Sequence, residues 1–243
     1  QNRNDCTHSM AGADTPELTL AGARIRLPSA PDSLRVGCED VTGFLPWAAA
    51  SRAAAAALPG EGPRLLLELG AGLGALGVRA AKSGFAVLSD KELPVLRLAS
   101  ETAAANDARG RCDVVAYDFA RGPPPFRPGA FDLLLASDVL FLDQLAAPLC
   151  SSLAALHTPE TRQRAILGHQ KRRAVYRGPD GNPCLEPEDS ALARFLALAG
   201  PHLQSQTEHP EEESVALLLE WPPPDTTQAR KRHRHEAPSE IAG

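Results

Sequence analysis

The sequence predicts an α/β fold with a mostly parallel sheet and helices on both of its faces. Three observations support this prediction. Strand-like and helix-like segments alternate from residue 64 to residue 200, and the first strand runs into a glycine-rich turn. The chain then closes on two adjacent strands joined by a loop too short for a helical crossover. Alternating elements require parallel strands covered by helices, whereas strands joined by a short loop pair antiparallel.

The alternating part contains five strands and four helices. The expected strands cover 64–69, 86–90, 113–119, 131–141 (the fourth strand together with its exit) and 164–170. The expected helices cover 75–84, 93–106, 143–156 and 187–200. The strand at 64–69 is apolar at successive positions, as in strands buried on both faces. Gly84 and Gly200 end helices, and Asp189 or Ser190 is a suitable N-cap. The closing antiparallel strands are expected at 202–208 and 214–221.

The N-terminal part predicts a small hairpin followed by a helix. Residues 18–28 form two short strand-like runs around Gly22. In the segment 43–60, Pro46 suits a first helical turn, and Pro59 and Gly60 end the helix. Residues 1–16 are expected to be a flexible lead, and the charged tail at 225–243 is expected to be disordered.

Composition excludes several classes of protein. A chain of 243 residues suits one large domain, and its net charge of −5 argues against a dedicated nucleic-acid-binding protein. The five cysteines are scattered without a C-x-x-C pair, which predicts reduced thiols, no zinc cluster, and a cytoplasmic or nuclear protein. No apolar stretch reaches the ~18 residues of a membrane span, and no signal-peptide core opens the chain. The basic run at 230–235 fits nuclear import or nucleic-acid contact, but so short a run is more often a solvated charge cluster.

The glycine-rich segment "LLLELGAGLGALG" (65–77) contains two overlapping signatures. From Gly72 it spells G-x-G-x-x-G, the dinucleotide pattern, and from Glu68 it spells E-x-G-x-G-x-G, which is typical of S-adenosylmethionine sites. Either pattern brings the backbone and the following helix N-terminus close to a ligand. Asp90 follows Gly72 by 18 residues, where a carboxylate reaches ribose hydroxyls in both cases.

Three features favour S-adenosylmethionine over NAD. The Glu68 carboxylate would face the cationic aminoacyl end of S-adenosylmethionine and repel a pyrophosphate. Neither Tyr117 nor Tyr176 is followed four residues later by the lysine that a short-chain reductase requires. No second domain is evident to hold a hydride acceptor. Simpler roles remain open: Gly74 and Gly77 could serve only helix–strand packing, and Asp90 could cap the following helix.

Several landmarks in fixed order resemble a known family. They are "GFLPW", "LELGAGLGALG", "VLSD", "YDF", "FDLLLASDVLF" and "SVALLLEW", spread over residues 18–221. They resemble the seven-β-strand protein lysine methyltransferases related to the chaperone- and calmodulin-directed enzymes. The resemblance implies a Rossmann-like, seven-stranded, mostly parallel sheet, with the methyltransferase domain at 61–224 and the hairpin and lead-in helix at 17–60. It also implies S-adenosylmethionine as methyl donor, S-adenosylhomocysteine as product and no metal.

The same resemblance implies a set of cofactor contacts. Trp47 would lie against the cofactor, Asp90 would hold the ribose, and Ser137 would line the pocket through its backbone. Phe119 stands where the family often has a tryptophan beside the adenine. The full expected set is Trp47, Glu68, Gly70, Ala71, Gly72, Gly74, Asp90, Asp118, Phe119 and Ser137.

Asp138 and Phe141 occupy the family's Asp-x-x-Tyr motif at the exit of the fourth strand. Asp138 would orient the acceptor amine and stabilise its charge, and Phe141 would form one wall of an aromatic cage. The other interpretations are a cap for helix 143–156 at Asp138 and a core residue at Phe141.

The leading functional hypothesis is therefore a protein-lysine N-methyltransferase. The expected partner is a protein carrying a lysine, such as a chaperone or another abundant cytosolic protein, and the enzyme is expected to be a monomer. One alternative is a methyltransferase acting on a small molecule or a nucleic acid, although the "SDVLF" segment differs from the N-P-P-Y pattern of base-modifying enzymes. Another is a non-catalytic interaction protein that retains the fold. Phe119 and Phe141 leave this alternative open, because they replace the tryptophan and the tyrosine of the family.

Overall fold

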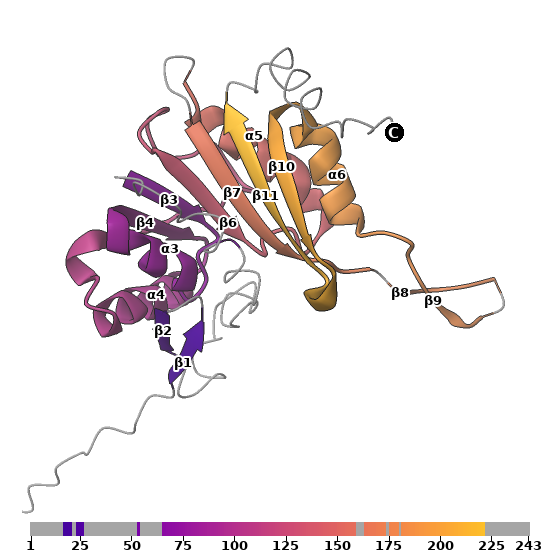
Figure 1. Cartoon of the computed structure of the whole chain (residues 1–243), viewed down its shortest axis with the longest axis horizontal. Helices are drawn as coiled ribbons and strands as arrows, with labels where there is room; N and C mark the ends of the chain where they lie inside the picture. The colour runs from indigo at the N-terminus through magenta and orange to yellow at the C-terminus, as the bar shows by residue number, and fades with distance from the viewer. Residues whose placement is uncertain are drawn as a thin grey trace, which may run out of the picture.

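The computed structural model describes residues 17–20, 23–26, 53, 65–158, 163–173, 175–179 and 181–221. Its centre is a seven-stranded sheet with the order β10-β11-β7-β6-β3-β4-β5 (Figure 1). The strands are β3 (Leu65–Leu69), β4 (Phe85–Asp90), β5 (Cys112–Ala116), β6 (Leu133–Ser137), β7 (Gln163–Gln170), β10 (Leu203–His209) and β11 (Ser214–Trp221). The five strands from β3 to β7 run parallel, and β11 pairs antiparallel with both β7 and β10. This confirms the predicted mostly parallel sheet with an antiparallel C-terminal pair.

Helices cover both faces of the sheet (Figure 1). They are α3 (Ala75–Ala80), α4 (Leu93–Ala105), α5 (Ala146–Leu156) and α6 (Ser190–Ala199). Leu66 of β3 packs in a cluster with α3 and α4, whereas Leu67 and Leu69 pack with α5 and α6. Since successive side chains of a strand point to opposite faces, a strand buried on both sides must be apolar throughout. The apolar run at 65–67 meets that requirement.

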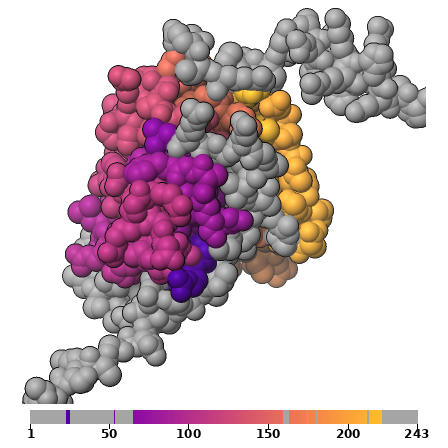
Figure 2. All heavy atoms as spheres, turned by 60° about the vertical axis from the view of Figure 1, so that its left-hand side comes forward, coloured from indigo at the N-terminus to yellow at the C-terminus, as the bar shows by residue number. Residues whose placement is uncertain are grey.

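A small N-terminal hairpin packs beside α3 and α4. It pairs β1 (Glu17–Leu20) with β2 (Ala23–Arg26) in antiparallel register, as the sequence predicts. Ile25 is buried with Val95 and Leu98 of α4, and the Arg24 N–H donates to Asn106 Oδ1 over 2.9 Å. The indigo atoms of the hairpin lie directly against the magenta helical layer (Figure 2). The expected helix at 43–60 lies outside the described residues, apart from Ala53, which is helical and buried.

Several element boundaries differ from the sequence prediction. The strand expected at 113–119 ends at Ala116. The segment expected at 131–141 as a strand with its exit forms a strand from Leu133 to Ser137, and its exit begins at Asp138. The helix expected from residue 143 begins as a 3-10 turn at Asp143–Leu145. Asp138 has a φ of 58°, which no β-strand accepts, so β6 must end before it.

One further hairpin was not predicted. It pairs β8 (Val175–Arg177) with β9 (Pro183–Leu185) and extends away from the sheet (Figure 1). Among the described helices, none has the length and apolar character that crossing a membrane would require.

Candidate functional site

The carboxyl ends of the five parallel strands meet at one edge of the sheet. The chain winds from β3 through β4 to β5 on one side, and then returns to β6 and β7 on the other side of β3. Open α/β sheets bind ligands where the winding reverses, because the loops separate there. The glycine loop after β3 and the Asp138 segment after β6 flank this point.

Three loops converge at Gly70: the glycine loop itself, the loop after β5 and the loop after β6. The Gly70 φ of 65° lies in the left-handed region, as do those of Gly72 and Gly74. A Cβ at position 70 would lie 2.6 Å from Val139 Cγ1 and 3.9 Å from Phe119 Cε1. The exits of β5 and β6 therefore approach the glycine loop so closely that only glycine fits.

Gly74 and Gly77 contact the protein interior. A Cβ at Gly74 would lie 3.1 Å from the Ala99 side chain, and one at Gly77 would lie 2.2 Å from Leu88 Cδ2. These distances support the packing interpretation for both glycines. Gly70 also packs against the protein, through Val139, and its backbone, like that of Gly72, stays a predicted ligand contact.

Glu68 lies inside the protein, beneath α3. Its Oε2 atom accepts a hydrogen bond of 2.8 Å from the Gly77 N–H, and the residue is 2% exposed. Burial raises the pKa of Glu68 to about 8, against the lowering effect of the Gly77 hydrogen bond. A raised pKa favours the neutral form of the carboxyl group, so the charge argument that favoured S-adenosylmethionine over NAD is weaker than the sequence suggested.

Asp90 joins the glycine loop to the start of α4. Its Oδ2 accepts from the Gly72 N–H over 3.0 Å, and its Oδ1 accepts from the Glu92 N–H over 3.1 Å. Burial raises the pKa of Asp90, and these two hydrogen bonds oppose that rise. The Lys91 backbone N–H also donates to this carboxylate, so one of its four lone pairs is left to accept a ribose hydroxyl.

The remaining expected cofactor residues lie on the loops around Gly70. Ala71 donates its N–H to the Ser89 carbonyl over 2.8 Å, and Asp118 accepts from the Ala120 N–H over 2.9 Å. The Ser137 hydroxyl is buried and has no hydrogen-bond partner among the described residues. Such a group at a strand exit is expected to bind a ligand or water. Trp47 lies outside the described residues.

The Asp138 side chain is completely buried and forms a bidentate ion pair with Arg172. Its Oδ1 accepts from the Gln170 N–H over 3.0 Å and from Arg172 Nη1 over 2.8 Å, and its Oδ2 pairs with Arg172 Nη2. This carboxylate raises the pKa of Arg172 above its usual range, chiefly through the hydrogen bond. The Asp138 side chain does not cap the 143–156 segment, whose first turn has no side-chain cap. That alternative interpretation is wrong.

His169 and Asp189 extend this ion pair into a cluster. His169 Nε2 lies 2.9 Å from Asp189 Oδ2, and His169 Nδ1 lies 3.7 Å from Asp138 Oδ1. Asp189 also accepts from the Arg172 N–H over 2.6 Å and caps α6 through the Leu192 N–H over 2.9 Å. Burial raises the pKa of Asp189, but the hydrogen bonds from His169, Leu192 and Arg172 outweigh it and leave the pKa below its ordinary value. We refer to Asp138, His169, Arg172 and Asp189 as the Asp138 cluster.

Sequence reasoning missed most of this cluster. It interpreted "HQKRR" (169–173) as a basic surface turn and Asp189 only as a helix cap. The available signal was a histidine and three basic residues at the exit of a predicted strand next to Asp138. Phe141 is half-buried and lies outside the buried core clusters of the described residues, which disfavours its interpretation as a core residue.

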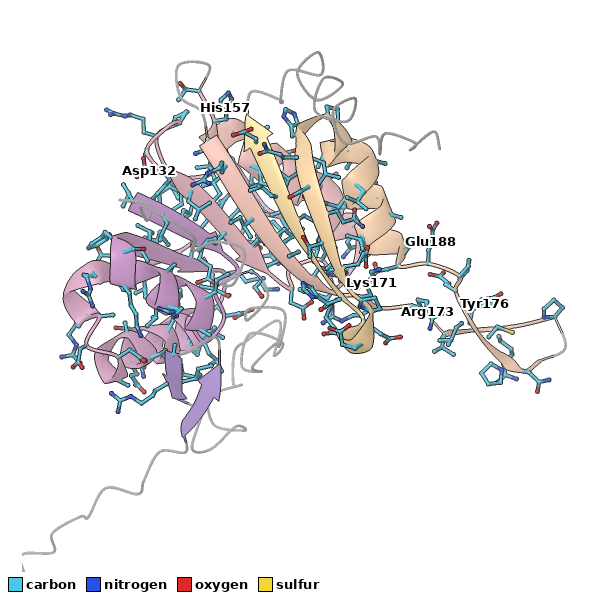
Figure 3. The ribbon with its side chains drawn as sticks, viewed as in Figure 1. Asp132, His157, Lys171, Arg173, Tyr176 and Glu188 are labelled. Atoms are coloured by element: carbon cyan, nitrogen blue, oxygen red, sulfur yellow. The ribbon has the colours of Figure 1, made fainter. Side chains whose placement is uncertain are left out.

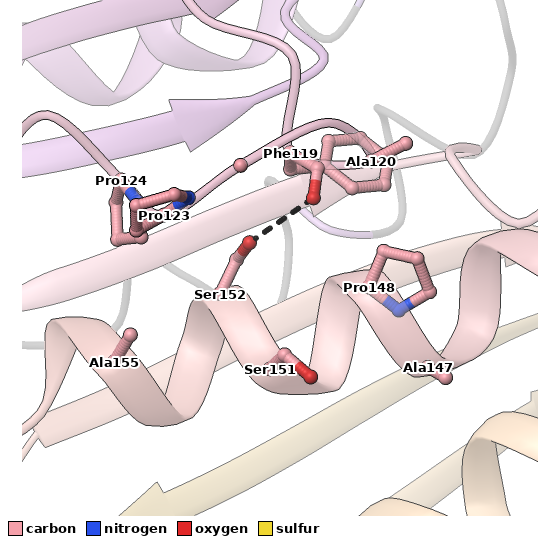
Figure 4. A pocket seen from close by; sticks show the side chains of 10 residues that line it. Phe119, Ala120, Pro123, Pro124, Ala147, Pro148, Ser151, Ser152 and Ala155 are labelled. Atoms are coloured by element: carbon pink, nitrogen blue, oxygen red, sulfur yellow. Dashed lines mark hydrogen bonds between the residues drawn. The ribbon is translucent and has the colours of Figure 1, made fainter.

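A groove of about 480 Å³ opens beside Phe119, between the proline-rich loop and α5 (Figure 4). Its floor includes Ser152, whose hydroxyl donates to the Phe119 carbonyl over 3.4 Å. The groove is lined by Phe119, Ala120, Gly122, Pro123, Pro124, Ala147, Pro148, Ser151, Ser152 and Ala155. Among the described residues, no group of three or more His, Cys, Asp or Glu side chains is arranged to hold a metal ion.

Comparison with known proteins defines the class. A family model described as lysine methyltransferase matches residues 56–177, about half of the chain, and the chain belongs to this family. It is therefore an S-adenosylmethionine-dependent methyltransferase. No curated protein is significantly similar to it in sequence.

Solved structures show the same fold at low sequence identity. The mitomycin 7-O-methyltransferase matches with a TM-score of 0.54 and 16% identity, over 79% of this chain and 60% of that one. A methyltransferase from Aquifex aeolicus matches with a TM-score of 0.53 and 13% identity, over 79% and 99%. A putative O-methyltransferase from Nostoc punctiforme gives 0.52 and 16%, over 70% and 56%. At these identities the comparison carries the fold alone.

The site fits S-adenosylmethionine in chemistry. Ser137 has a buried hydroxyl without a partner among the described residues, and Asp90 retains acceptor capacity. Both lie at the strand exits where this fold binds its ligands.

Proposed function

We propose that this protein transfers a methyl group from S-adenosylmethionine to a lysine side-chain amine of a protein substrate. The observation that carries the proposal is the position of Asp138, directly before Val139, whose side chain lies against Gly70. Asp138 is therefore the chain neighbour of a residue that contacts the glycine loop, in a chain that belongs to the lysine methyltransferase family.

In this proposal Gly70, Ala71 and Gly72 approach the methionine part of the cofactor. Asp90 accepts from a ribose hydroxyl with its remaining lone pair, and the Asp118–Phe119 turn lies beside the adenine. Ser137 contributes through its hydroxyl as well as its backbone. Glu68 and Gly74 act indirectly, because Glu68 holds α3 through Gly77 and Gly74 packs against Ala99. Trp47 stays a sequence-based proposal.

The cofactor supplies an electrophilic methyl group on a sulfonium. The protein must place an amine lone pair in line with that methyl and exclude water. The Asp138 carboxylate orients the amine and stabilises the positive charge that the amine acquires during transfer. Phe141 forms an aromatic wall beside this cation.

We further propose a protein partner carrying an exposed lysine, such as a chaperone or another abundant cytosolic protein. The enzyme is proposed to act as a monomer in the cytoplasm or nucleus.

The direct test is methyl transfer with tritiated S-adenosylmethionine to proteins of a cell lysate, followed by acid hydrolysis. The expected product is labelled Nε-methyllysine. Label in a small molecule or in nucleic acid would contradict the protein-lysine assignment. Calorimetry with S-adenosylhomocysteine separates the enzyme from a non-catalytic relative, because an interaction protein that has lost its cofactor site would bind none.

Asp138→Asn tests the catalytic assignment. Removing a group that stabilises developing charge is expected to lower transfer per folded molecule by a factor on the order of 10². The affinity for S-adenosylhomocysteine, measured on the same preparation, should change little. Asp143→Asn is the matched control, since this exposed carboxylate on the next turn should be replaceable without loss. Undiminished turnover in folded Asp138→Asn would refute the assignment.

A further inference from the structure

Arg172 separates Asp138 from solvent. The Asp138 side chain is 0% exposed, whereas the Arg172 side chain is 31% exposed. At this point of the edge, the surface therefore presents a guanidinium, and the carboxylate used in the proposed function lies behind it.

The hydrogen bonds of Asp138 leave little room for another cation. Oδ1 already accepts from the Gln170 N–H and from Arg172 Nη1, which uses both of its lone pairs. Oδ2 accepts from Arg172 Nη2 and keeps one lone pair. Because Oδ2 is buried, an ammonium group reaches it only when the guanidinium moves away.

The backbone of Arg172 is held independently of its side chain. Its N–H donates to Asp189 Oδ2, and Asp189 is anchored by His169 and by the first turn of α6. The guanidinium itself is bound by Asp138 and by the Gln170 carbonyl, which lies 2.9 Å from Nη1. The contacts of the guanidinium with Asp138 and Gln170 can therefore break without disturbing the Asp189 contact that holds the Arg172 backbone.

We propose that Arg172 determines acceptor specificity: the side-chain nitrogen of the substrate lysine must replace the Arg172 guanidinium at Asp138. It enters as an ammonium ion and releases one proton to solvent before its lone pair attacks the methyl group. This inference rests on the proposed function. A guanidinium in the same chain competes at high effective concentration, so a free amine binds poorly. A lysine on a protein surface competes well, because the rest of that surface contributes binding energy. Competition by Arg172 therefore lowers the affinity for small amines more than the affinity for lysines on a protein surface.

The test uses n-butylammonium chloride, which carries the cation of a lysine side chain on an alkyl stem. Its affinity is measured by isothermal titration for the wild type, Arg172→Gln and the double variant Asp138→Asn/Arg172→Gln. Arg172→Gln is expected to bind at least about 10-fold more tightly than the wild type, because the internal competitor is gone. The double variant should lose this gain, because the carboxylate is gone as well.

Two further variants keep the test decisive. Arg173→Gln is the matched control, since Arg173 is a neighbouring arginine that forms an ion pair with Glu213 at 3.9 Å. This variant should bind n-butylammonium as the wild type does. Arg172→Lys keeps a cation with a single point of attachment, and should give an intermediate affinity even if Arg172→Gln folds poorly. Binding of S-adenosylhomocysteine confirms that each protein is folded. Equal affinity in the wild type and both Arg172 variants, or a gain that survives in the double variant, would overturn the proposal.

Methyl transfer to free lysine provides a second readout. Arg172→Gln should increase it by about 10-fold, with the Arg173→Gln rate unchanged. A protein-lysine product together with unchanged butylammonium affinity would remove only the role of Arg172. A butylammonium gain together with label on a non-lysine acceptor would instead contradict the proposed function.

Discussion

At Gly70 a backbone requirement and a packing requirement coincide. Its φ of 65° is strained for any residue with a side chain, and a Cβ would overlap Val139 Cγ1. Gly70→Ala is therefore expected to lower the free energy of unfolding by about 1–3 kcal/mol. It should also weaken S-adenosylhomocysteine binding by at least about 10-fold, which is about 1.4 kcal/mol.

The matched control for Gly70 is Gly110→Ala. A Cβ at Gly110 would meet no atom within 4 Å, so its effect on stability and binding should be small. Denaturant unfolding and calorimetry on both variants give the comparison. Equal effects at the two positions would contradict the convergence of the loops on Gly70.

Glu68 is expected to make the stability depend on pH. Its pKa rises from 4.5 to about 8 on folding, so the folded state binds the proton more tightly than the unfolded state. Stability is then fully present below pH 4.5 and is lost as the pH rises towards 8. Between these values the free energy of unfolding should fall by roughly 2–5 kcal/mol through this group.

Glu68→Gln should flatten this dependence. Glutamine keeps an oxygen that accepts from the Gly77 N–H and cannot ionise. Urea unfolding at pH 5, 7 and 9 measures the effect, and Glu101→Gln, on the exposed side of α4, serves as the control. A variant as sensitive to alkaline pH as the wild type would show that Glu68 is not the responsible group.

The sequence predicted the position of Asp138 but not its partner. A strand followed by an acidic residue is visible within ten residues of chain. Arg172 lies 34 residues further on, and only the parallel register of β6 and β7, in which Ser137 lies opposite Gly168, brings it to Asp138. No local pattern carries that information.

At the scale of elements, the sequence predicted which strands and helices are present better than it predicted their first and last residues. The segment 131–141 was predicted as a strand together with its exit, but Val139 and Leu140 are apolar again after Ser137 and Asp138, so composition alone does not mark the last strand residue. The backbone leaves the sheet at Asp138, because its N–H donates to the Gly168 carbonyl while its φ turns positive. The burial of the Asp138 carboxylate therefore depends on this tertiary contact with β7 and not on the local sequence.

The N-terminus of α6 provides a prediction at this scale. Asp189→Ala removes the N-cap, at about 0.5–2 kcal/mol, and leaves the buried His169 ring without its 2.9 Å partner. An unpaired buried donor adds about 1–3 kcal/mol. The total loss in the free energy of unfolding at pH 7 should therefore exceed that of an ordinary cap.

Asp189→Ser separates the two contributions, because a serine hydroxyl caps the helix but is too short to reach His169. Thermal or urea unfolding of the two variants measures the difference. The low pKa of Asp189 means that its stabilisation is present above its unfolded value of about 3.9 and disappears as the pH falls through the lower folded value. Equal stabilities of the alanine and serine variants at pH 7 would leave no energetic role for the cap.

At the scale of the whole molecule, alternation of strands and helices was enough to predict the sheet, its two helical layers and the closing pair. The β8–β9 hairpin was missed because each strand has only three residues. The signal was present in "GPDGNP" (178–183), a dense turn sequence between two short runs. The hairpin follows Lys171 and Arg173, which Figure 3 shows at its base near the turn between β10 and β11. Lys171 forms an ion pair with Glu208 there.

The layered architecture predicts where the molecule opens first. Strand β6 is paired on both sides, by β3 and β7, and Leu133, Leu134 and Leu135 are at most 1% exposed. Exchange of its amide hydrogens is therefore expected to require global unfolding. The β8–β9 hairpin has two strands only and exposes Val175, Tyr176 and Leu185 by 67%, 50% and 54%. A two-stranded hairpin with so little buried apolar surface opens locally.

Hydrogen-exchange mass spectrometry should therefore find peptides covering 133–137 protected on the order of 10³-fold more than peptides covering 175–185. The ratio should shrink in denaturant, because global unfolding becomes accessible while local opening of the hairpin changes little. Comparable protection of the two segments in the isolated protein would mean that the hairpin packs against another part of the chain. If a protein substrate binds at this edge of the sheet, as proposed, adding it should slow exchange in the hairpin and leave β6 unchanged.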